Sequence, residues 1–78
     1  ASRGADADLQ ARFAQLTARE RQVFQLVVAG QLNKQIAGAL GIAERTVKAQ
    51  RAQVMTKLGA ATAAELGRIA AQLQLHSG

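Results

Sequence analysis

The sequence contains no cysteine and a single histidine among its 78 residues. Without cysteine the chain has neither a disulfide framework nor a thiolate metal site. The histidine, His76, lies near the C-terminus, where a solitary histidine is usually a solvated side chain, so we expect no metal ligand there. No apolar run approaches the roughly 20 residues that cross a membrane, and no signal-peptide pattern opens the chain. We therefore expect a cytoplasmic protein without a membrane partner.

Motifs of enzymatic sites are also missing from the sequence. It contains no Ser–His–Asp set, no paired His or Cys ligands and no phosphate-cradling glycine loop. Internal repeats, low-complexity tracts and strand-like alternation are missing too. We therefore expect no enzymatic activity, no cofactor, and an all-α fold of four or five short helices.

Acidic residues are few, and the basic residues are unevenly distributed. Ten Lys and Arg face five Asp and Glu, which gives a net charge of +5. The segment 33–58 holds five bases and a single acid, so it carries +4 of that charge. A basic balance favours polyanionic partners.

This basic segment has the pattern of two helices joined by a tight turn. Ile36, Ala37 and Leu40 give the first helix one apolar face, and Gly41 ends it. The second helix is predicted over 44–58, with its apolar side formed by Val47, Val54, Met55 and Leu58. The small Ala37, the glycine four residues later and the valine six residues after that form the pattern of a helix-turn-helix, whose second helix faces a DNA major groove.

The opposite side of the second helix is the candidate base-reading surface. The Lys48 ammonium can donate to guanine N7 and O6, while the small Ala49 and Ala52 let the helix sit deep in the groove. Thr46 and Gln50 can donate to phosphates.

Other polar residues of the segment are candidates for contact with the DNA backbone. Arg45 and Lys57 can add salt-dependent affinity. Asn33 is predicted to cap the first helix, and Lys34 in its first turn is interpreted as facing a phosphate. Arg51 lies close to the apolar seam, so its stem can pack while its guanidinium reaches a phosphate at the edge.

The flanking segments predict two further helices and leave the N-terminal end open. Capping boxes at 17–20 and 62–65 begin helices over about 18–29 and 63–75. Residues 9–16 form either a short helix or a tail that packs one or two apolar side chains. Ala64, Gly67 and Ala71 form a stripe of small residues with Arg68 beside it, which is either a surface for self-association or a smooth solvated face.

Residues 16–75 resemble the C-terminal DNA-binding domain of the LuxR type. The matching pieces are LTARERQV, GQLNKQIAGALGI, RTVKAQRAQVMTKLGA and the TAAEL helix. The NKQIA, TVK and VMTKL segments, with Arg51, look closest to FixJ-like two-component response regulators. The resemblance implies a compact four-helix bundle with a possible extra N-terminal linker helix, in which residues 1–15 are the tail of an interdomain linker and 16–78 are the domain.

The resemblance also implies roles for residues and partners. In domains of this type the third helix of the bundle reads DNA and the fourth forms the dimer. The dimer would bind inverted-repeat sites in double-stranded DNA. Further implied partners are a phosphorylatable receiver domain of the same chain and RNA polymerase. The implied positions are base-facing Lys48, Ala49 and Ala52; backbone-facing Asn33, Lys34, Thr46 and Gln50; and a dimer face of Ala64, Gly67, Arg68 and Ala71.

Some positions depart from the family pattern, and two other kinds of function stay open. Ala43 stands where Ser or Thr usually caps the recognition helix, and Gln50 replaces a usual His. Within DNA binding, the alternatives are a quorum-sensing LuxR-type regulator or the promoter-reading end of a sigma factor. Outside it, the alternative is a helical protein-interaction module, which predicts no steep salt dependence of DNA affinity.

Overall fold

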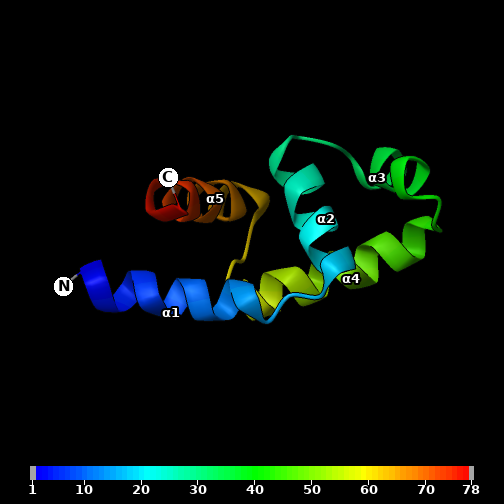
Figure 1. Ribbon diagram of the computed structural model, residues 1–78. Coiled ribbons are helices and arrows are strands. Elements are labelled where there is room, and N and C mark those ends of the chain that lie inside the picture. Colours follow the sequence, from blue (N-terminus) through cyan, green and yellow to red (C-terminus); the bar gives the residue numbers. More distant parts are fainter. Residues whose placement is uncertain (1, 78) are drawn as a thin grey trace.

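The computed structural model describes the backbone of residues 2–77 and the side chains of residues 7–73, and in this part of the chain the regular secondary structure consists of helices joined by short turns (Figure 1). Ala1, Gly78 and the side chain of His76 lie outside the described set. The helices are α1 (Ser2–Ala14), α2 (Ala18–Val28), α3 (Asn33–Leu40), α4 (Glu44–Leu58) and α5 (Ala63–Ser77). The predicted all-α fold with an additional N-terminal helix is confirmed. None of the described helices is long and apolar enough to pass through a membrane.

One hydrophobic core joins α2, α3, α4 and α5. Its most deeply buried side chains come from all four helices and are Val23, Ile36, Val47, Val54 and Leu66. Leu16, just after α1, is buried as well. Val28 is 38% exposed, because it is the last residue of α2 and lies beside the stripe formed by Val23 and Val27.

The turns of the fold follow from local sequence. The predicted capping box at Thr17 is present: the Thr17 hydroxyl accepts from the backbone N–H of Glu20 at 3.1 Å, and the Glu20 carboxylate accepts from the N–H of Thr17 at 2.9 Å. Gly41 and Gly59 end α3 and α4 with φ of 68° and 70°. A side chain is strained in this left-handed conformation, so glycine is the residue that lets the chain turn there.

Two predicted caps differ in detail from the structure. At α5 the Thr62 hydroxyl accepts from the N–H of Glu65 at 3.2 Å, but the Glu65 carboxylate reaches one residue further back, to the N–H of Ala61 at 2.7 Å. Asn33 does not cap α3. It is the first helical residue, and the N–H of Leu32 before it donates to Gln35 Oε1 at 2.8 Å. Polar side chains near a helix start can satisfy different backbone groups, and the sequence does not say which.

Helix α1 is longer than predicted and begins earlier. The sequence left residues 9–16 open between a short helix and a packed tail, with the residues before them as linker, whereas the helix covers Ser2–Ala14. Its Asp8 and Arg12 form an ion pair at 3.0 Å, one turn apart. At its last turn the ring of Phe13 meets Phe24 of α2 edge to face, with ring centres 5.5 Å apart. Tertiary packing at Phe13 therefore supports a helix whose sequence has little amphipathic pattern.

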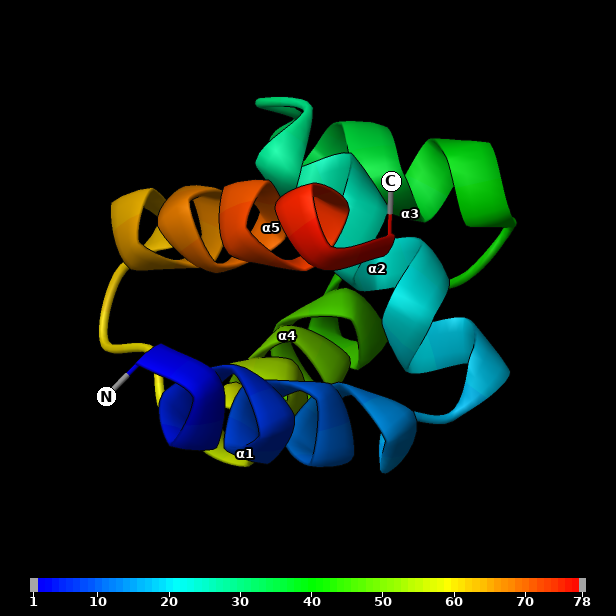
Figure 2. The same ribbon diagram turned by 60° about the vertical axis from the view of Figure 1, so that its left-hand side comes forward.

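The molecule is elongated, with extents of 40 × 21 × 19 Å. Helix α3 and the start of α4 form one end, whereas α1 and α5 lie side by side at the other (Figures 1 and 2). Helix α2 lies between these ends and packs against α3, α4 and α5. The two helices of the predicted helix-turn-helix are therefore held away from the end at which the chain enters.

Candidate nucleic-acid interface

The α3–α4 unit has the geometry of a helix-turn-helix. Ile36 and Ala37 of α3 belong to the same buried core as Val47 of α4, and all three are at most 8% exposed. The two helices pack against each other. The turn is closed by the N–H of Ile42, which donates to the carbonyl oxygen of Ala37 at 3.0 Å. The small alanine and the left-handed Gly41 thus have the roles that their spacing predicted.

The outer side of α4 forms a surface that we call the recognition face. It contains the exposed residues Arg45, Lys48, Ala49 and Ala52, opposite the buried Val47, Val54 and Leu58. Gln53 and Thr56 are exposed as well and extend this face by about one turn. Sequence reasoning missed these two, although their spacing of four residues from Ala49 and Ala52 is the signal that finds them.

The positive charge of this end of the molecule is concentrated on three exposed bases. They are Lys34 at the start of α3, and Arg45 and Lys48 on α4. Ala43 precedes α4 without a side-chain hydrogen bond to its first turn, as expected from its lack of an oxygen. No cluster of His, Asp or Glu suited to a metal ion occurs among the described residues. This surface offers hydrogen-bond donors and positive charge, the groups that attract a polyanion.

Arg51 and Asn33, two of the predicted backbone contacts, lie next to each other. Arg51 Nη1 donates to Asn33 Oδ1 at 3.0 Å, across 18 residues of sequence. Both side chains are half-buried. The structure therefore brings these two residues together at the start of α3, and the Arg51 guanidinium contacts its own domain there.

Lys57, also predicted to contact the DNA backbone, lies apart from this group. Its Nζ atom is 2.8 Å from Glu20 Oε1, and the two side chains are 29% and 9% exposed. The hydrogen bond from Lys57, followed by that from the N–H of Thr17, lowers the pKa of Glu20 below its ordinary value of 4.5. This ion pair joins α4 to the start of α2, so Lys57 has an internal partner.

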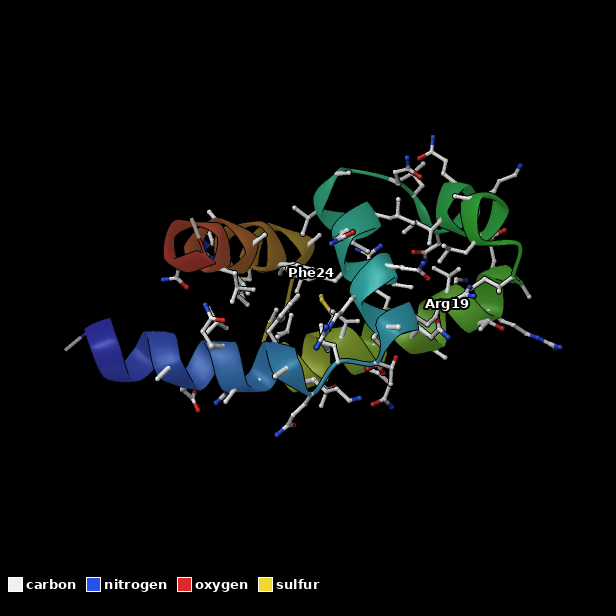
Figure 3. The ribbon with its side chains drawn as sticks, viewed as in Figure 1. Arg19 and Phe24 are labelled. Carbon is white, nitrogen blue, oxygen red and sulfur yellow. The ribbon has the colours of Figure 1, made fainter. Side chains whose placement is uncertain are left out.

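Gln50 is half-buried on α4, and its Oε1 atom is fully covered without a hydrogen-bond partner among the described residues. The same holds for Arg19 Nη1. Figure 3 shows Arg19 at the start of α2, a helix that packs against α4. The Gln50 amide also carries an NH2 group, which is its hydrogen-bond donor.

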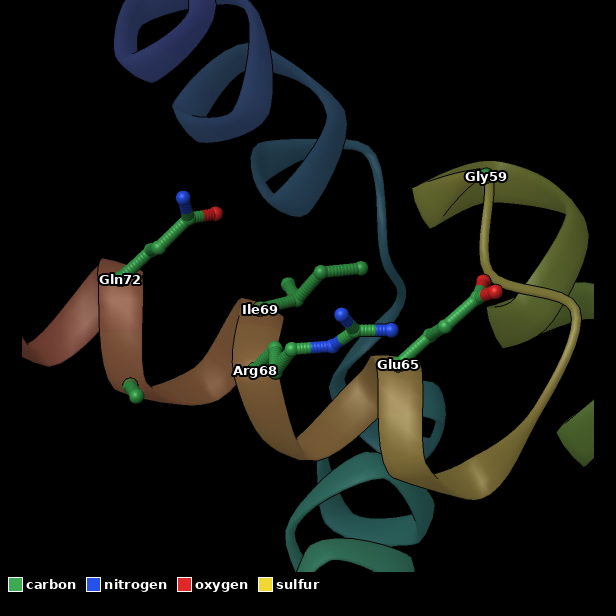
Figure 4. A pocket seen from close by; sticks show the side chains of 6 residues that line it. Gly59, Glu65, Arg68, Ile69 and Gln72 are labelled. Atoms are coloured by element: carbon green, nitrogen blue, oxygen red, sulfur yellow. The ribbon is translucent and has the colours of Figure 1, made fainter. Parts of the chain in front are cut away.

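The predicted dimer face lies on α5. Ala64, Arg68 and Ala71 are exposed, and Gly67 is half-buried. A Cβ atom placed on Gly67 would meet nothing within 4 Å, so the absence of a side chain has no steric cause inside this chain. Beside this face lies an open hollow of about 500 Å³, lined by Gly59, Glu65, Arg68, Ile69, Ala71 and Gln72 (Figure 4).

Two helices that cross at a glycine turn, the second with an exposed basic face of small residues, define a helix-turn-helix DNA-binding domain. The family model GerE, described as bacterial regulatory proteins of the luxR family, matches residues 14–70. The chain therefore belongs to the LuxR family of bacterial regulatory proteins, whose members are DNA-binding regulators of transcription and not enzymes.

Individual relatives agree with the predicted FixJ-like branch. The chain is 54% identical to the transcriptional regulatory protein FixJ of Azorhizobium caulinodans over 59 residues, which are 76% of this chain and 28% of FixJ. The solved response regulator StyR has a TM-score of 0.87 at 45% identity, covering 91% of this chain and 36% of StyR. Full-length FixJ from B. japonicum has a TM-score of 0.78 at 40% identity, covering 95% of this chain and 38% of FixJ. The chain thus spans well under half of each of these proteins.

Proposed function

We propose that this domain binds double-stranded DNA at specific sequences by placing α4 in the major groove. The observation that carries the proposal is the recognition face, where Lys48, Ala49 and Ala52 are exposed together on the side opposite the core. Lys48 is the donor toward guanine, and the two alanines allow close approach and contact with thymine methyl groups.

Contacts with the DNA backbone orient α4 in this proposal. Lys34, Arg45, Thr46 and Gln50 are the phosphate-binding residues, together with the amide of Asn33. Lys34 and Arg45 are exposed cations on either side of the turn, and Gln50 would donate through its NH2 group. We leave Lys57 out of this set because its ammonium is paired with Glu20.

The active form in this proposal is a homodimer joined through α5. Ala64, Gly67, Arg68 and Ala71 form its contact surface, and the open space around Gly67 supports close approach of a second copy. A symmetric dimer presents two recognition helices to two half-sites, so the preferred DNA is an inverted repeat.

In its full-length context the domain is the effector of a cytoplasmic two-component response regulator in this proposal. The likeness to FixJ and to the response regulator StyR supports this assignment. A receiver domain would precede α1 in the chain, with residues 1–15 as the end of the linker, and its phosphorylation would favour the dimer. RNA polymerase is the further partner in transcription.

The test of this function is a selection from a random double-stranded DNA library at about physiological salt. Enrichment of an inverted repeat supports direct readout by a dimer. Binding without enrichment would leave a basic helical domain with non-specific affinity and would contradict the proposal.

The proposed base-reading lysine, Lys48, can be tested by replacement. Lys48→Ala should lower the affinity for the selected site by about 1–3 kcal/mol and relax the preference at one base pair. Competition binding with single-base variants of the site measures this. Lys34→Ala is the matched control, because it removes the same charge from a phosphate-facing position and should weaken all sequences alike. An unchanged site preference in Lys48→Ala would rule out its role.

A further inference from the structure

Arg51 is an unusual residue for its place on α4. It lies four residues after Val47 and three before Val54, both of which are fully buried. The Arg51 side chain is half-buried beside these valines. Its Nη1 atom donates to Asn33 Oδ1 at 3.0 Å. Among the described residues this is the one side-chain hydrogen bond recorded between α3 and α4.

The partner atoms fix the orientation of the Asn33 amide. A guanidinium has five donors and no acceptor, so the amide atom that faces it is the carbonyl oxygen. The NH2 group of Asn33 must then point to the other side of the amide. Asn33 is the first residue of α3 and precedes the exposed Lys34. If the DNA backbone runs past the start of α3, as proposed above, the Nδ2 donor is the group of Asn33 that can reach it.

The packing of α3 on α4 has other sources. Ile36 and Val47 are fully buried, and Ala37 is 8% exposed. These apolar contacts bring the two helices together without a polar link, whereas the Asn33 amide would rotate without Arg51. The hydrogen bond thus has its main effect on the direction of a donor.

We propose that Arg51 is a positioning residue for DNA binding, which holds the Asn33 amide so that Nδ2 donates to a backbone phosphate. Arg51 does not itself bind a phosphate in this arrangement. Arg51 thereby links α4, the recognition helix, to a contact between α3 and the DNA backbone. The position of α4 in the groove is then tied to the position of α3 on the phosphates. The inference depends on the proposed DNA-binding function and adds the route by which Arg51 serves it.

A double-mutant cycle with Arg51→Met and Asn33→Ala tests this coupling. Methionine keeps an unbranched stem beside Val47 and Val54 and removes the donor. Dissociation constants are measured by fluorescence anisotropy on the selected duplex at several salt concentrations. The temperature is kept well below the unfolding midpoint of each variant. Each single variant should weaken binding about two- to tenfold, and the double variant should bind no more weakly than Asn33→Ala. Arg51→Lys, which keeps a donor and the charge, should recover part of the loss.

The salt dependence separates positioning from direct contact. Because Asn33 is neutral, Arg51→Met should leave the slope of log affinity against log salt nearly unchanged. Lys34→Met is the control for a cation that faces a phosphate, and it should lower the slope by about 0.9.

Three outcomes would overturn the positioning role while DNA binding by the wild-type chain stands. They are additive losses in the cycle, a slope change in Arg51→Met as large as in Lys34→Met, or an Asn33→Ala variant with wild-type affinity. A wild-type chain that binds no duplex would instead reject the proposed function, and this role with it.

Discussion

Glu20 joins local and distant structure through one carboxylate. It completes the capping box with Thr17 and accepts from Lys57 Nζ at 2.8 Å. These hydrogen bonds, that from Lys57 first, lower its pKa below the ordinary value of 4.5. A carboxylate whose pKa is lowered by folding stabilises the folded state above the unfolded pKa. That contribution is lost as the pH falls through the folded pKa, because the unfolded chain then binds more protons.

Replacement of this carboxylate is expected to change the acid stability of the domain. Glu20→Gln should lower the free energy of unfolding at pH 7 by about 1–2 kcal/mol, since it removes a charged hydrogen bond from a partly exposed lysine. The difference from wild type should shrink as the pH falls below about 4.5. Urea unfolding from pH 7 down to pH 3 measures both quantities.

The control for that prediction is Asp8→Asn, which removes the same charge from an exposed pair on α1. Its effect at pH 7 should stay under about 0.5 kcal/mol. A Glu20→Gln variant whose deficit is independent of pH would show that the loss comes from packing instead of charge.

At the residue scale, local patterns were predictable and distant pairs were not. The Thr17–Glu20 capping box follows from four adjacent letters, whereas the partner of Glu20 lies 37 residues further along. Asn33 shows the same limit: its position suggested a cap, but its carbonyl oxygen accepts from Arg51, 18 residues away. Which residue a side chain meets depends on how helices cross, and single-residue propensities do not contain that information.

At the scale of the helix, α5 has a glycine that the folded chain does not require. A Cβ on Gly67 meets nothing within 4 Å, and the same is true of Gly38 in α3. Replacement of either glycine by alanine should raise the free energy of unfolding by about 1 kcal/mol, since alanine loses less backbone entropy in a helix. Only Gly67 lies on the proposed dimer face.

These two glycines provide a matched test of the dimer. Gly67→Ala should stabilise the domain but reduce cooperative binding to DNA with two half-sites by about tenfold, because added side chains in a close contact cost about 1–3 kcal/mol. Gly38→Ala should raise the free energy of unfolding to a similar extent and leave cooperative DNA binding unchanged. Cooperativity is the ratio of affinities for duplexes with two and with one half-site. Wild-type cooperativity in Gly67→Ala would exclude this face.

The predictability of whole helices followed the strength of their patterns. Helices α2, α3 and α4 have apolar stripes and clear ends, and their predicted bounds were close to those observed. Helix α1 has no such stripe beyond Leu9 and Phe13, so the sequence predicts linker, not helix, for its first seven residues. It is stabilised by contacts with α4 and α5 that no local pattern contains.

For the whole molecule, the last turn of α1 attaches that helix to the other helices. The Phe13 ring lies 5.5 Å from that of Phe24 and 5.3 Å from the guanidinium carbon of Arg21. Arg12 lies against Gly59, where a Cβ would be 2.6 Å from its Nη1. The last turn of α1 therefore touches both α2 and the end of α4.

Loss of the Phe13 ring should release α1 from the rest of the domain. Phe13→Ala should lower the free energy of unfolding by about 2–3 kcal/mol, less than for a fully buried phenylalanine. Phe13→Leu should cost about half as much because it keeps apolar volume. Hydrogen exchange of the backbone amides should speed up in residues 2–14 of the alanine variant and stay slow in the cores of α2 and α4. Persistent protection of α1 would contradict the proposed anchoring role.

The attachment of α1 has a geometric consequence for a longer regulator in which this helix continues upstream. Each residue of an α-helix turns the chain by about 100° and advances it by about 1.5 Å. With Phe13 anchored, one residue added ahead of it would swing an upstream domain through more than a quarter of a circle around the helix axis, with little change in distance. The number of residues between an upstream domain and Phe13 therefore determines the direction of that domain around the helix axis as well as its distance.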